Sequence, residues 1–254
     1  MILALEAVSK SFAGLQALAG VSFEMGPSEI TAVIGPNGAG KTTLFNVVTG
    51  VFPPTGGAIR FLGKDIAGLP PERIVGLGVS RTFQHVRLFR TLTVLENVML
   101  ARHQHSRSET VACGLRLPRA RREEADIRAA ALEHLDLLGL SDQRDRIAPE
   151  LPLGQQRYVE LARALATEPR LILLDEPTAG LNEREADEFG EVLFRIRERG
   201  IALLLIEHHM RFVMKVSDRI VVLNFGRKIA EGMPAEIQTS PQVIEAYLGI
   251  DERD

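Results

Sequence analysis

The sequence predicts an α/β fold, with a parallel sheet at its core, a smaller antiparallel sheet before it and a block of helices inserted into it. Three observations support this prediction. Apolar runs at 30–34, 171–174 and 201–206 have the length and continuity of strands buried on both faces of a parallel sheet. A helical pattern at 182–199 lies between two of these runs, as in wound α/β sheets. From about residue 84 to 170 the pattern is helical.

The first strands along the chain are expected to form the antiparallel sheet. Residues 3–8, 21–25 and 58–62 are shorter apolar segments separated by glycine and proline. We therefore predict a single domain over residues 1–254. Its α/β core, with the antiparallel part, covers about 1–84 and 171–254, and its helical subdomain covers about 85–170.

The helical block carries its own start and stop signals. Thr93 and Glu96 are spaced as a capping box, in which each side chain binds the other residue's free backbone amide. A second helix is predicted to end at Gly139, a residue suited to a helix C-cap. The residues that share one face of that helix are Ile127, Ala131, Leu135 and Leu138.

Composition excludes several classes of protein. The chain has 254 residues, 45% hydrophobic and 25% charged, with a net charge of −3, so no overall positive field attracts nucleic acid. The single cysteine, Cys113, excludes a disulfide framework and fits a reducing compartment. The N-terminus has no signal-peptide pattern, and the run at 201–206 is far shorter than the roughly 20 residues of a spanning helix. Any work at a membrane is therefore expected from its surface.

A glycine-rich motif follows the first parallel strand. It matches G-x-x-x-x-G-K-[ST], and its residues are Gly35, Pro36, Asn37, Gly38, Ala39, Gly40, Lys41, Thr42 and Thr43. The glycines allow backbone amides to surround phosphate oxygens, and the next helix presents its positive N-terminus to the same anion. Lys41 is expected to reach the β- and γ-phosphates, and Thr42 to ligate Mg²⁺. The motif predicts a phosphate loop that binds Mg-ATP.

Two consecutive carboxylates end the strand at 171–174. Asp175 is the expected Mg²⁺ partner, and Glu176 is the expected general base for an attacking water. Such a base contributes roughly 10²–10⁴ in rate. An apolar run that ends in Asp-Glu is common, so this assignment depends on the phosphate loop upstream.

The order of these motifs resembles the ATP-binding cassette (ABC) family over essentially the whole chain. After the phosphate loop come Gln84 and the segment Leu151–Arg157 (here called the signature segment), which is followed by a predicted helix from Tyr158 to Ala166. The Asp175-Glu176 strand comes next, with His208 beyond the following strand. The resemblance implies a P-loop NTPase cassette with a RecA-like parallel-sheet core. It also implies that two cassettes enclose two ATP molecules, the signature segment of each contacting the γ-phosphate bound by the other.

The resemblance assigns roles to further residues. Gln84 would sense Mg²⁺ and the nucleophilic water, His208 would contact the γ-phosphate, and Phe12 would stack on adenine. Residues 179–182 would form the loop called the D-loop. The signature residues expected at the partner's nucleotide are Leu153, Gly154 and Gln155.

Two of these roles have alternatives. Gln84 could instead be a surface amide, and Phe12 could be a core residue at a strand end. His209 is expected to be solvated.

The chain departs from the family pattern at two positions. Pro152 stands where the signature segment has serine, and it supplies neither a hydroxyl nor a backbone N–H. A hydroxyl bonded to a charged phosphate contributes roughly 1.5–3 kcal/mol, so we expect a weakened half-site. Asn182 replaces the usual aspartate of the D-loop.

Three segments are similar to the LivG-type ATPases of high-affinity branched-chain amino-acid importers. These are residues 81–89 together with 92–98, residues 205–208 and residues 241–249. The resemblance implies a heterodimer with a second cassette, or alternatively a homodimer, beneath two transmembrane permease subunits. A periplasmic binding protein would deliver the substrate. The chain would then be peripheral, at the cytoplasmic face of the plasma (inner) membrane. Related importers carry urea, short amides or aromatic acids, so a small polar substrate of this kind is the alternative to a branched-chain amino acid.

Other ABC proteins are the rival classes. Cassette ATPases of DNA repair need a long coiled-coil insertion, but only about 110 residues separate Lys41 from Leu151, without sustained heptads. Translation-factor cassette proteins carry two cassettes, and this chain carries one. A regulatory cassette without hydrolysis is disfavoured by Glu176 and His208, and mildly favoured by Pro152.

Overall fold

The computed structural model describes residues 1–82, 87–102 and 118–248. It divides into two compact units. The core unit comprises Met1–Arg81 and Arg170–Asp254, and the helical unit comprises Thr82–Pro169. The boundaries predicted near residues 84 and 170 lie close to these limits. That both units belong to one ABC ATPase domain stays a prediction.

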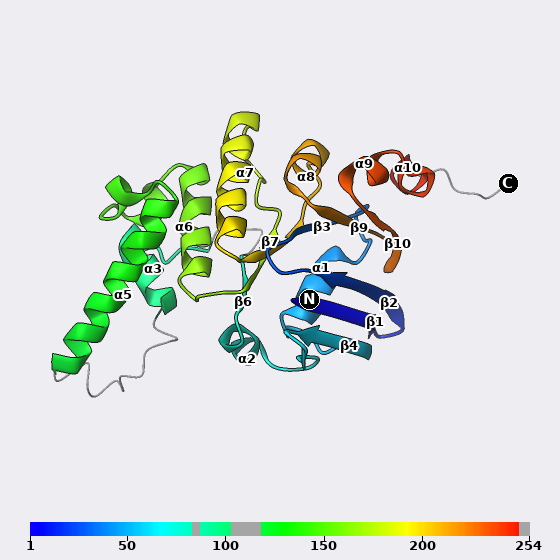
Figure 1. Ribbon diagram of the computed structural model, residues 1–254, viewed down its shortest axis with the longest axis horizontal. Helices are drawn as coiled ribbons and strands as arrows, with labels where there is room; N and C mark the ends of the chain where they lie inside the picture. Colours follow the sequence, from blue (N-terminus) through cyan, green and yellow to red (C-terminus); the bar gives the residue numbers. More distant parts are fainter. Residues whose placement is uncertain (83–86, 103–117, 249–254) are drawn as a thin grey trace. The chain divides into compact units, whose positions relative to one another are not determined.

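The main sheet of the core unit has the strand order β10-β9-β3-β8-β7-β6 within the described residues (Figure 1). Its strands are β3 (Ile30–Ile34), β6 (Val79–Arg81), β7 (Leu171–Asp175), β8 (Ala202–Ile206), β9 (Arg219–Asn224) and β10 (Arg227–Gly232). The pairs from β9 to β6 are parallel, and β10 pairs antiparallel with β9. Every residue of β3, β7 and β8 is buried, which confirms the three predicted central strands. Because parallel strands share one carboxyl edge, the residues that follow these strands come together there.

A second, antiparallel sheet has the order β2-β1-β4-β5. Its strands are β1 (Leu3–Phe12), β2 (Leu15–Met25), β4 (Gly56–Phe61) and β5 (Lys64–Asp65). β1 and β2 are longer than predicted because pairing continues past the apolar segments through register shifts. The tight connection at Ala13 and Gly14 uses positive φ angles of 44° and 91°. The predicted antiparallel part of the α/β fold is confirmed.

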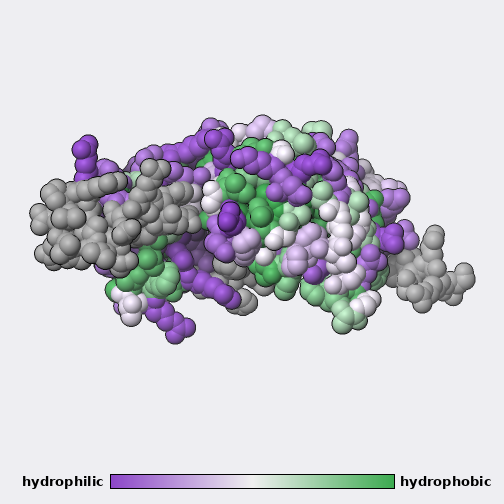
Figure 2. All heavy atoms as spheres, turned by 90° about the horizontal axis from the view of Figure 1, so that it is seen from below, coloured by the Kyte–Doolittle hydropathy of each residue, from purple (hydrophilic) through white to green (hydrophobic). Residues whose placement is uncertain are grey.

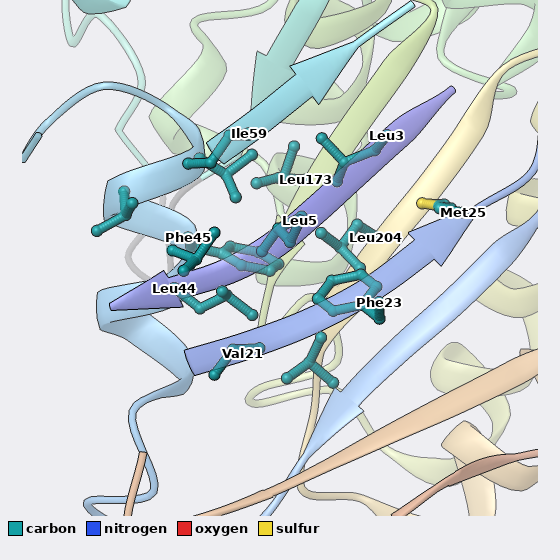
Figure 3. Close-up of a cluster of buried hydrophobic side chains, with 14 of the residues drawn as sticks. Leu3, Leu5, Val21, Phe23, Met25, Leu44, Phe45, Ile59, Leu173 and Leu204 are labelled. Atoms are coloured by element: carbon teal, nitrogen blue, oxygen red, sulfur yellow. The ribbon is translucent and has the colours of Figure 1, made fainter. Parts of the chain in front are cut away.

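The core of this unit lies where helix α1 (Lys41–Val48) meets side chains from both sheets. Figure 3 shows Leu44 and Phe45 of α1 beside Leu5 of β1 and Leu173 of β7. All four of these side chains are essentially inaccessible to solvent. The packing therefore fixes α1, and with it the phosphate loop that precedes it, on the main sheet.

The remaining helices of the core unit are α2 (Pro71–Gly76), α7 (Glu183–Glu198), α8 (Met210–Val216), α9 (Pro234–Gln238) and α10 (Pro241–Leu248). The helix predicted at 182–199 is confirmed as α7. Asn182 is its N-cap and Arg199 its C-cap.

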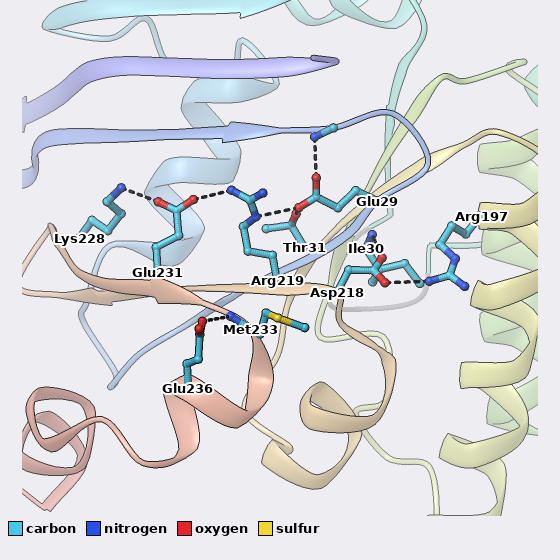
Figure 4. A network of polar contacts seen from close by, with 11 residues as sticks. Glu29, Ile30, Thr31, Arg197, Asp218, Arg219, Lys228, Glu231, Met233 and Glu236 are labelled. Carbon is cyan, nitrogen blue, oxygen red and sulfur yellow. Dashed lines mark hydrogen bonds and ion pairs between the residues drawn. The ribbon is translucent and has the colours of Figure 1, made fainter.

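Charged side chains connect the C-terminal strands to the rest of the main sheet (Figure 4). Arg219 of β9 pairs with Glu29 at 3.0 Å and with Glu231 of β10 at 3.0 Å. Lys228 also donates to Glu231, at 2.6 Å. The ion pair raises the pKa of Arg219, and the two cations lower the pKa of Glu231 although its partial burial acts in the opposite direction.

The helical unit contains α3 (Val94–Arg102), α5 (Pro118–Leu137) and α6 (Leu153–Leu165), with short 3₁₀ turns at Ser141–Gln143 and Ala148–Glu150. The predicted capping box is confirmed: Thr93 N donates to Glu96 Oε2 at 2.8 Å, and Glu96 N donates to Thr93 Oγ1 at 3.2 Å. Gly139 follows α5 with a φ of 67°, as predicted.

The start of α6 corrects the sequence prediction. We expected the helix to begin at Tyr158, after the signature segment, but it begins at Leu153, inside that segment. Pro152 takes an extended N-cap conformation, with φ −53° and ψ 150°, and proline is well tolerated at the entrance of a helix because its missing N–H is not needed there.

The face of the molecule in Figure 2 is a mosaic of hydrophilic and hydrophobic residues. Within the part of the chain that the structure describes, no helix has both the length and the apolar character needed to cross a membrane.

Candidate functional site

The phosphate loop connects β3 to α1 through backbone conformations that favour glycine. Gly35, Gly38 and Gly40 have φ angles of 149°, 81° and 101°. A Cβ on Gly35 would overlap the carbonyl oxygen of Leu223, and a Cβ on Gly40 would lie 2.6 Å from the carbonyl oxygen of Ala17. Two of the three glycines are therefore required by the close approach of neighbouring backbone.

Gly38 differs because a Cβ there would meet nothing within 4 Å. The space beside it is open, and Asn37 next to it is exposed. At the end of the loop, α1 begins without a side-chain cap hydrogen bond, so its first backbone amides have no side-chain acceptor at the N-cap. The loop thus offers open space next to a helix N-terminus, which fits a polyphosphate.

Lys41 is the cation of this loop. Its Nζ donates to the carbonyl oxygens of Gly35 at 2.6 Å and Pro36 at 2.9 Å, so the ammonium is held over the loop. Burial lowers the pKa of Lys41, and the negative charge of Glu176 partly opposes that shift. An additional anion at the loop would stabilise the charged form.

Asp175 ends β7 and is nearly buried, as predicted for a strand-end carboxylate. Its Oδ2 accepts from Arg81 NH2 at 2.7 Å. Arg81 ends the neighbouring strand β6, and its NH1 also donates to Asn46 Oδ1 of α1 at 2.7 Å. The guanidinium therefore ties the predicted Mg²⁺ ligand to the helix that follows the phosphate loop, and the second carboxylate oxygen of Asp175 remains for another ligand.

Glu176 has a backbone conformation that side chains rarely adopt. Its φ is 48°, in the left-handed region, although Pro177 follows it and a residue before proline normally takes an extended conformation. Its amide donates to Ile206 O of β8 at 2.9 Å, which holds the residue in place. Such strain persists only where surrounding structure imposes it, and it is concentrated at functional sites.

His208 faces Glu176 across the carboxyl edge of the sheet. Its Nδ1 lies 3.8 Å from Glu176 Oε1, and its side chain is 67% exposed. We expected His209 to be the solvated member of the pair, but it is only partly exposed, because it is the residue that enters α8. The structure thus brings together three predicted site residues: Lys41, Glu176 and His208.

Phe12 lies at the end of β1, as predicted, with 37% of its surface exposed. Its ring is edge-on to that of Phe52, with centroids 5.2 Å apart, and the Lys10 ammonium lies 4.9 Å from its centroid. The alternative that Phe12 is a core residue fits this accessible ring less well. Stacking on adenine stays a prediction.

In the helical unit, the signature segment forms the N-terminus of α6. Gln156 closes the preceding turn by donating through Nε2 to Pro149 O at 3.1 Å and to Leu151 O at 2.8 Å.

The first turn of α6 begins with Leu153, which is exposed, and continues with Gly154 and Gln155. Pro152 provides no side-chain cap hydrogen bond. The first turn therefore has backbone amides available to an anion.

Gln84 and Asn182 are the remaining predicted residues of the nucleotide site and the D-loop. Gln84, expected near Mg²⁺, lies outside the described residues. Asn182, in place of the expected aspartate, caps α7: its Oδ1 accepts from Glu185 N at 3.0 Å and its N donates to Glu185 Oε2 at 2.9 Å. Asparagine and aspartate are about equally good N-caps, which explains why this replacement is tolerated structurally.

Comparison with known families decides the identity. The family model described as "ABC transporter" matches residues 18–179, which include the phosphate loop, the signature segment and the Asp175-Glu176 strand. The chain belongs to the ABC transporter family. A second model, "Branched-chain amino acid ATP-binding cassette transporter", matches residues 227–253 of the cassette.

The relatives of this cassette agree with the predicted branch of the family. It is 44% identical to the high-affinity branched-chain amino acid transport ATP-binding protein BraF of Pseudomonas aeruginosa, over 98% of both chains. It is also 44% identical to the corresponding protein LivG of Escherichia coli K12, again over 98% of both chains. The resemblance to LivG-type ATPases is confirmed.

Solved structures confirm the fold. The cassette is similar to the ADP conformation of an ATP-binding cassette of an ABC transporter, with a TM-score of 0.86 and 34% identity over 98% of both chains. A nucleotide-free ATP-binding cassette has a TM-score of 0.85 and 34% identity, covering 97% of this chain and 98% of that chain. The cassette is thus a nucleotide-binding ATPase with the predicted fold.

Sequence reasoning missed two charged residues of this cassette. Arg81 and Glu207 both lie in segments that resemble LivG-type proteins, and neither was assigned a role. For Glu207 the available signal was its place directly after the apolar run at 201–206, because a charged group beside a buried strand needs a partner. Which partner it has could not be read from the sequence.

Proposed function

We propose that this chain is the ATP-hydrolysing subunit of an importer for branched-chain amino acids. The observation that carries the proposal is that Lys41, Glu176 and His208 lie together at the carboxyl edge of the sheet where β7 ends at Asp175. The substrate class rests on the C-terminal family match at residues 227–253 and on the relatives BraF and LivG, whose names state branched-chain amino acid transport.

ATP is the substrate that fits the phosphate loop. Residues Gly35–Thr43 offer backbone amides, open space beside Gly38 and the ammonium of Lys41. When polyphosphate binds, Lys41 exchanges loop carbonyls for phosphate oxygens, which compensates the burial of its charge. Phe12 provides an exposed aromatic face for adenine.

Mg²⁺ is the metal that fits the donor set. Asp175 supplies a carboxylate and Thr42 a hydroxyl, with Gln84 as the proposed third contact. No group of three or more histidine, cysteine or acidic side chains that could hold a metal exists within the described ranges. A site with few protein ligands suits Mg²⁺, which keeps several waters and binds substrate phosphates. When bound, it neutralises charge on the β- and γ-oxygens.

Glu176 is proposed as the general base. Its strained backbone directs the side chain toward the carboxyl edge of the sheet, within 3.8 Å of the His208 ring. There the carboxylate can accept a proton from the water that attacks the γ-phosphorus, while His208 orients that water and the phosphate. ATP bound between the two cassettes is proposed to drive closure of the dimer, and its hydrolysis ends that closed state.

The signature residues Leu153, Gly154 and Gln155 are proposed to close over ATP bound by a partner cassette. Free amides at the start of α6 would face the γ-phosphate. A similar cassette, with a TM-score of 0.77 and 25% identity, is described as a dimer bound to ADP and Pi, which supports this mode. Because Pro152 lacks the hydroxyl of a signature serine, we infer that the two sites of a heterodimer are unequal, whereas both sites of a homodimer would carry the proline.

The partners and location follow from the same proposal. A second cassette forms a heterodimer with this chain, or alternatively this chain forms a homodimer. Two permease subunits cross the membrane, a periplasmic binding protein delivers the amino acid, and nucleic acid is not a partner. The chain is proposed to lie peripherally at the cytoplasmic face of the inner membrane.

Glu176→Gln tests the hydrolytic assignment. Glutamine keeps the size of the side chain but cannot accept the proton, so we expect phosphate release by the purified transporter to fall roughly 10²- to 10⁴-fold. Binding of a fluorescent ATP analogue should be retained. Turnover equal to the parent protein would exclude Glu176 as the general base.

Direct binding measurements test the substrate. The binding protein that works with this transporter should bind leucine, isoleucine or valine, and these amino acids should stimulate ATP hydrolysis by the assembled transporter. Binding of urea, a short amide or an aromatic acid in their place would replace the branched-chain assignment and leave the ATPase assignment intact.

A further inference from the structure

A buried carboxylate lies directly before His208. Glu207 follows β8 at the carboxyl edge of the main sheet, and its relative exposure is 1%. Burying a carboxylate is costly unless its oxygens are fully hydrogen-bonded. Among the described residues, Glu207 has no cation within ion-pair distance, so its negative charge depends on neutral donors.

Those donors come from two loops that flank the proposed catalytic pair. Glu207 Oε1 accepts from Thr178 N at 2.9 Å and from Thr178 Oγ1 at 2.6 Å. Glu207 Oε2 accepts from His208 N at 3.1 Å and, more weakly, from His209 N at 3.4 Å. Thr178 lies two residues after Glu176. One oxygen therefore holds the loop of the general base, and the other holds the loop of the histidine.

We propose that Glu207 is a positioning residue for ATP hydrolysis, which sets the Glu176 loop and the His208 loop in register. This inference rests on the proposed function of Glu176 and His208. Neither loop is regular secondary structure at this point, so no strand or helix ladder holds them to each other. The hydrogen bond from Glu176 N to Ile206 O holds Glu176 to the end of β8. The side chain of Glu207 holds Thr178 to the residues that directly follow β8.

The charge state of Glu207 matters because all four of its contacts are donors. A glutamine side chain can turn one carbonyl oxygen toward Thr178, but its amide nitrogen then faces the backbone N–H groups of His208 and His209. Two donors would meet, and buried amides would lose their acceptor. Glu207→Gln is therefore nearly isosteric and yet incompatible with the observed hydrogen bonds.

The experiment measures ATP affinity, turnover and thermal stability in the purified transporter that contains this chain. In Glu207→Gln we expect kcat to fall roughly ten- to a hundredfold, which is the scale of hydrogen bonds to a charged group. ATP affinity should change less than about twofold, since Glu207 reaches ATP only through other residues. Thr178→Val, which removes one donor, should lower kcat by a smaller factor, and Thr178→Ser should retain it.

Glu29→Gln is the matched control. Glu29 also accepts from a backbone amide, Gly26 N at 2.6 Å, and from a threonine hydroxyl, Thr31 Oγ1 at 3.0 Å. It also pairs with Arg219, and it precedes β3, at the opposite end of that strand from the phosphate loop. Its substitution should change thermal stability but keep kcat within about twofold of the parent.

A double-mutant cycle decides between positioning and general structural support. If Glu207 acts through Thr178, the Glu207→Gln/Thr178→Val double variant should lose little more kcat than Glu207→Gln alone. Additive losses, or equal losses of kcat, affinity and stability, would overturn the proposal. If Glu207→Gln does not fold, the kcat of Thr178→Val and Thr178→Ser tests the contact alone: equal kcat in both would also overturn it.

Glu176→Gln separates this proposal from the proposed function. If Glu176→Gln loses turnover while Glu207→Gln keeps it, only the positioning role is excluded. If Glu176→Gln keeps turnover, the general-base assignment fails, and the positioning role fails with it.

Discussion

The phosphate loop and the signature segment each lead into the start of a helix, and both helix starts are proposed to face an anion, but the two are built differently. α1 begins after Gly40 in a left-handed conformation, and α6 begins after Pro152 in an extended one. Neither N-cap forms a side-chain hydrogen bond. The backbone conformation of Gly40 is accessible almost only to glycine, whereas many residues could adopt the conformation of Pro152. The comparison explains why the first motif matches its family pattern while the second departs from it.

Close packing causes this difference. Gly35 and Gly40 lie against the backbone carbonyls of Leu223 and Ala17, which leave no room for a Cβ. In the signature segment, Pro152 and Leu153 are exposed, so a changed side chain displaces nothing. A family motif is therefore most strictly required where backbone approaches backbone. It can vary where the side chain is exposed, as at Pro152 and Leu153.

The largest expected effect is the difference between replacing a glycine of the phosphate loop, Gly40, and replacing a glycine of the signature segment, Gly154. Gly40→Ala places a side chain at φ 101°, 2.6 Å from Ala17 O, and should lower the free energy of unfolding by about 1–3 kcal/mol or more and weaken ATP binding severely. Gly154→Ala, within helix α6, should leave that free energy unchanged or raise it by up to about 1 kcal/mol. Thermal unfolding and ATP titration measure both. Equal destabilisation by the two variants would remove the contrast.

A smaller effect is expected for Pro152→Ser. Serine restores the hydroxyl of the signature segment and can cap α6, which contributes about 0.5–2 kcal/mol to stability. Loss of proline costs about 0.4–1 kcal/mol through the unfolded chain. We expect a net change below about 1.5 kcal/mol and an ATPase rate in the assembled transporter that rises or stays the same. A large loss of ATPase would show that the proline is itself required.

The smallest effect is a pH dependence in the helix that carries the signature segment. Burial raises the pKa of Glu160 above its usual 4.5, although the amide of Arg87 and nearby arginines oppose the shift. Below pH 4.5 the carboxyl is protonated in both states, and its contribution to stability is fully present. As pH rises above 4.5 the unfolded chain loses its proton first, so this contribution is lost as pH passes the folded pKa.

Glu160→Gln tests this shift because glutamine does not titrate. The free energy of unfolding of the variant, relative to the parent, should increase with pH above 4.5. Denaturant unfolding at several pH values measures the difference. A difference that stays constant with pH would exclude the raised pKa.

Several parts of the fold could be predicted because they depend on short stretches of sequence. Residues close together in the sequence determine three such parts: the strand at Ile30–Ile34, the Thr93–Glu96 capping box and the helix after Asn182. Each depends only on residues of one strand or of one or two helical turns. The start of α6 was misplaced because a proline with a glycine two residues later, Pro152 and Gly154, is typical of a loop as well as of a helix entrance. The Pro149–Gln156 and Leu151–Gln156 hydrogen bonds that settle it form only in the folded turn.

The sequence by itself determined the phosphate loop, the carboxylates Asp175 and Glu176, and the family, because spacing along the chain encodes them. Only the tertiary structure decided the partners of the buried charges. Arg81 and Asp175 are 94 positions apart, and Thr178 and Glu207 are 29 apart. Neighbouring parallel strands bring each pair together at the carboxyl edge of the sheet. No local pattern specifies such a pair, since the order of strands in the sheet, and not the distance along the chain, sets which residues meet.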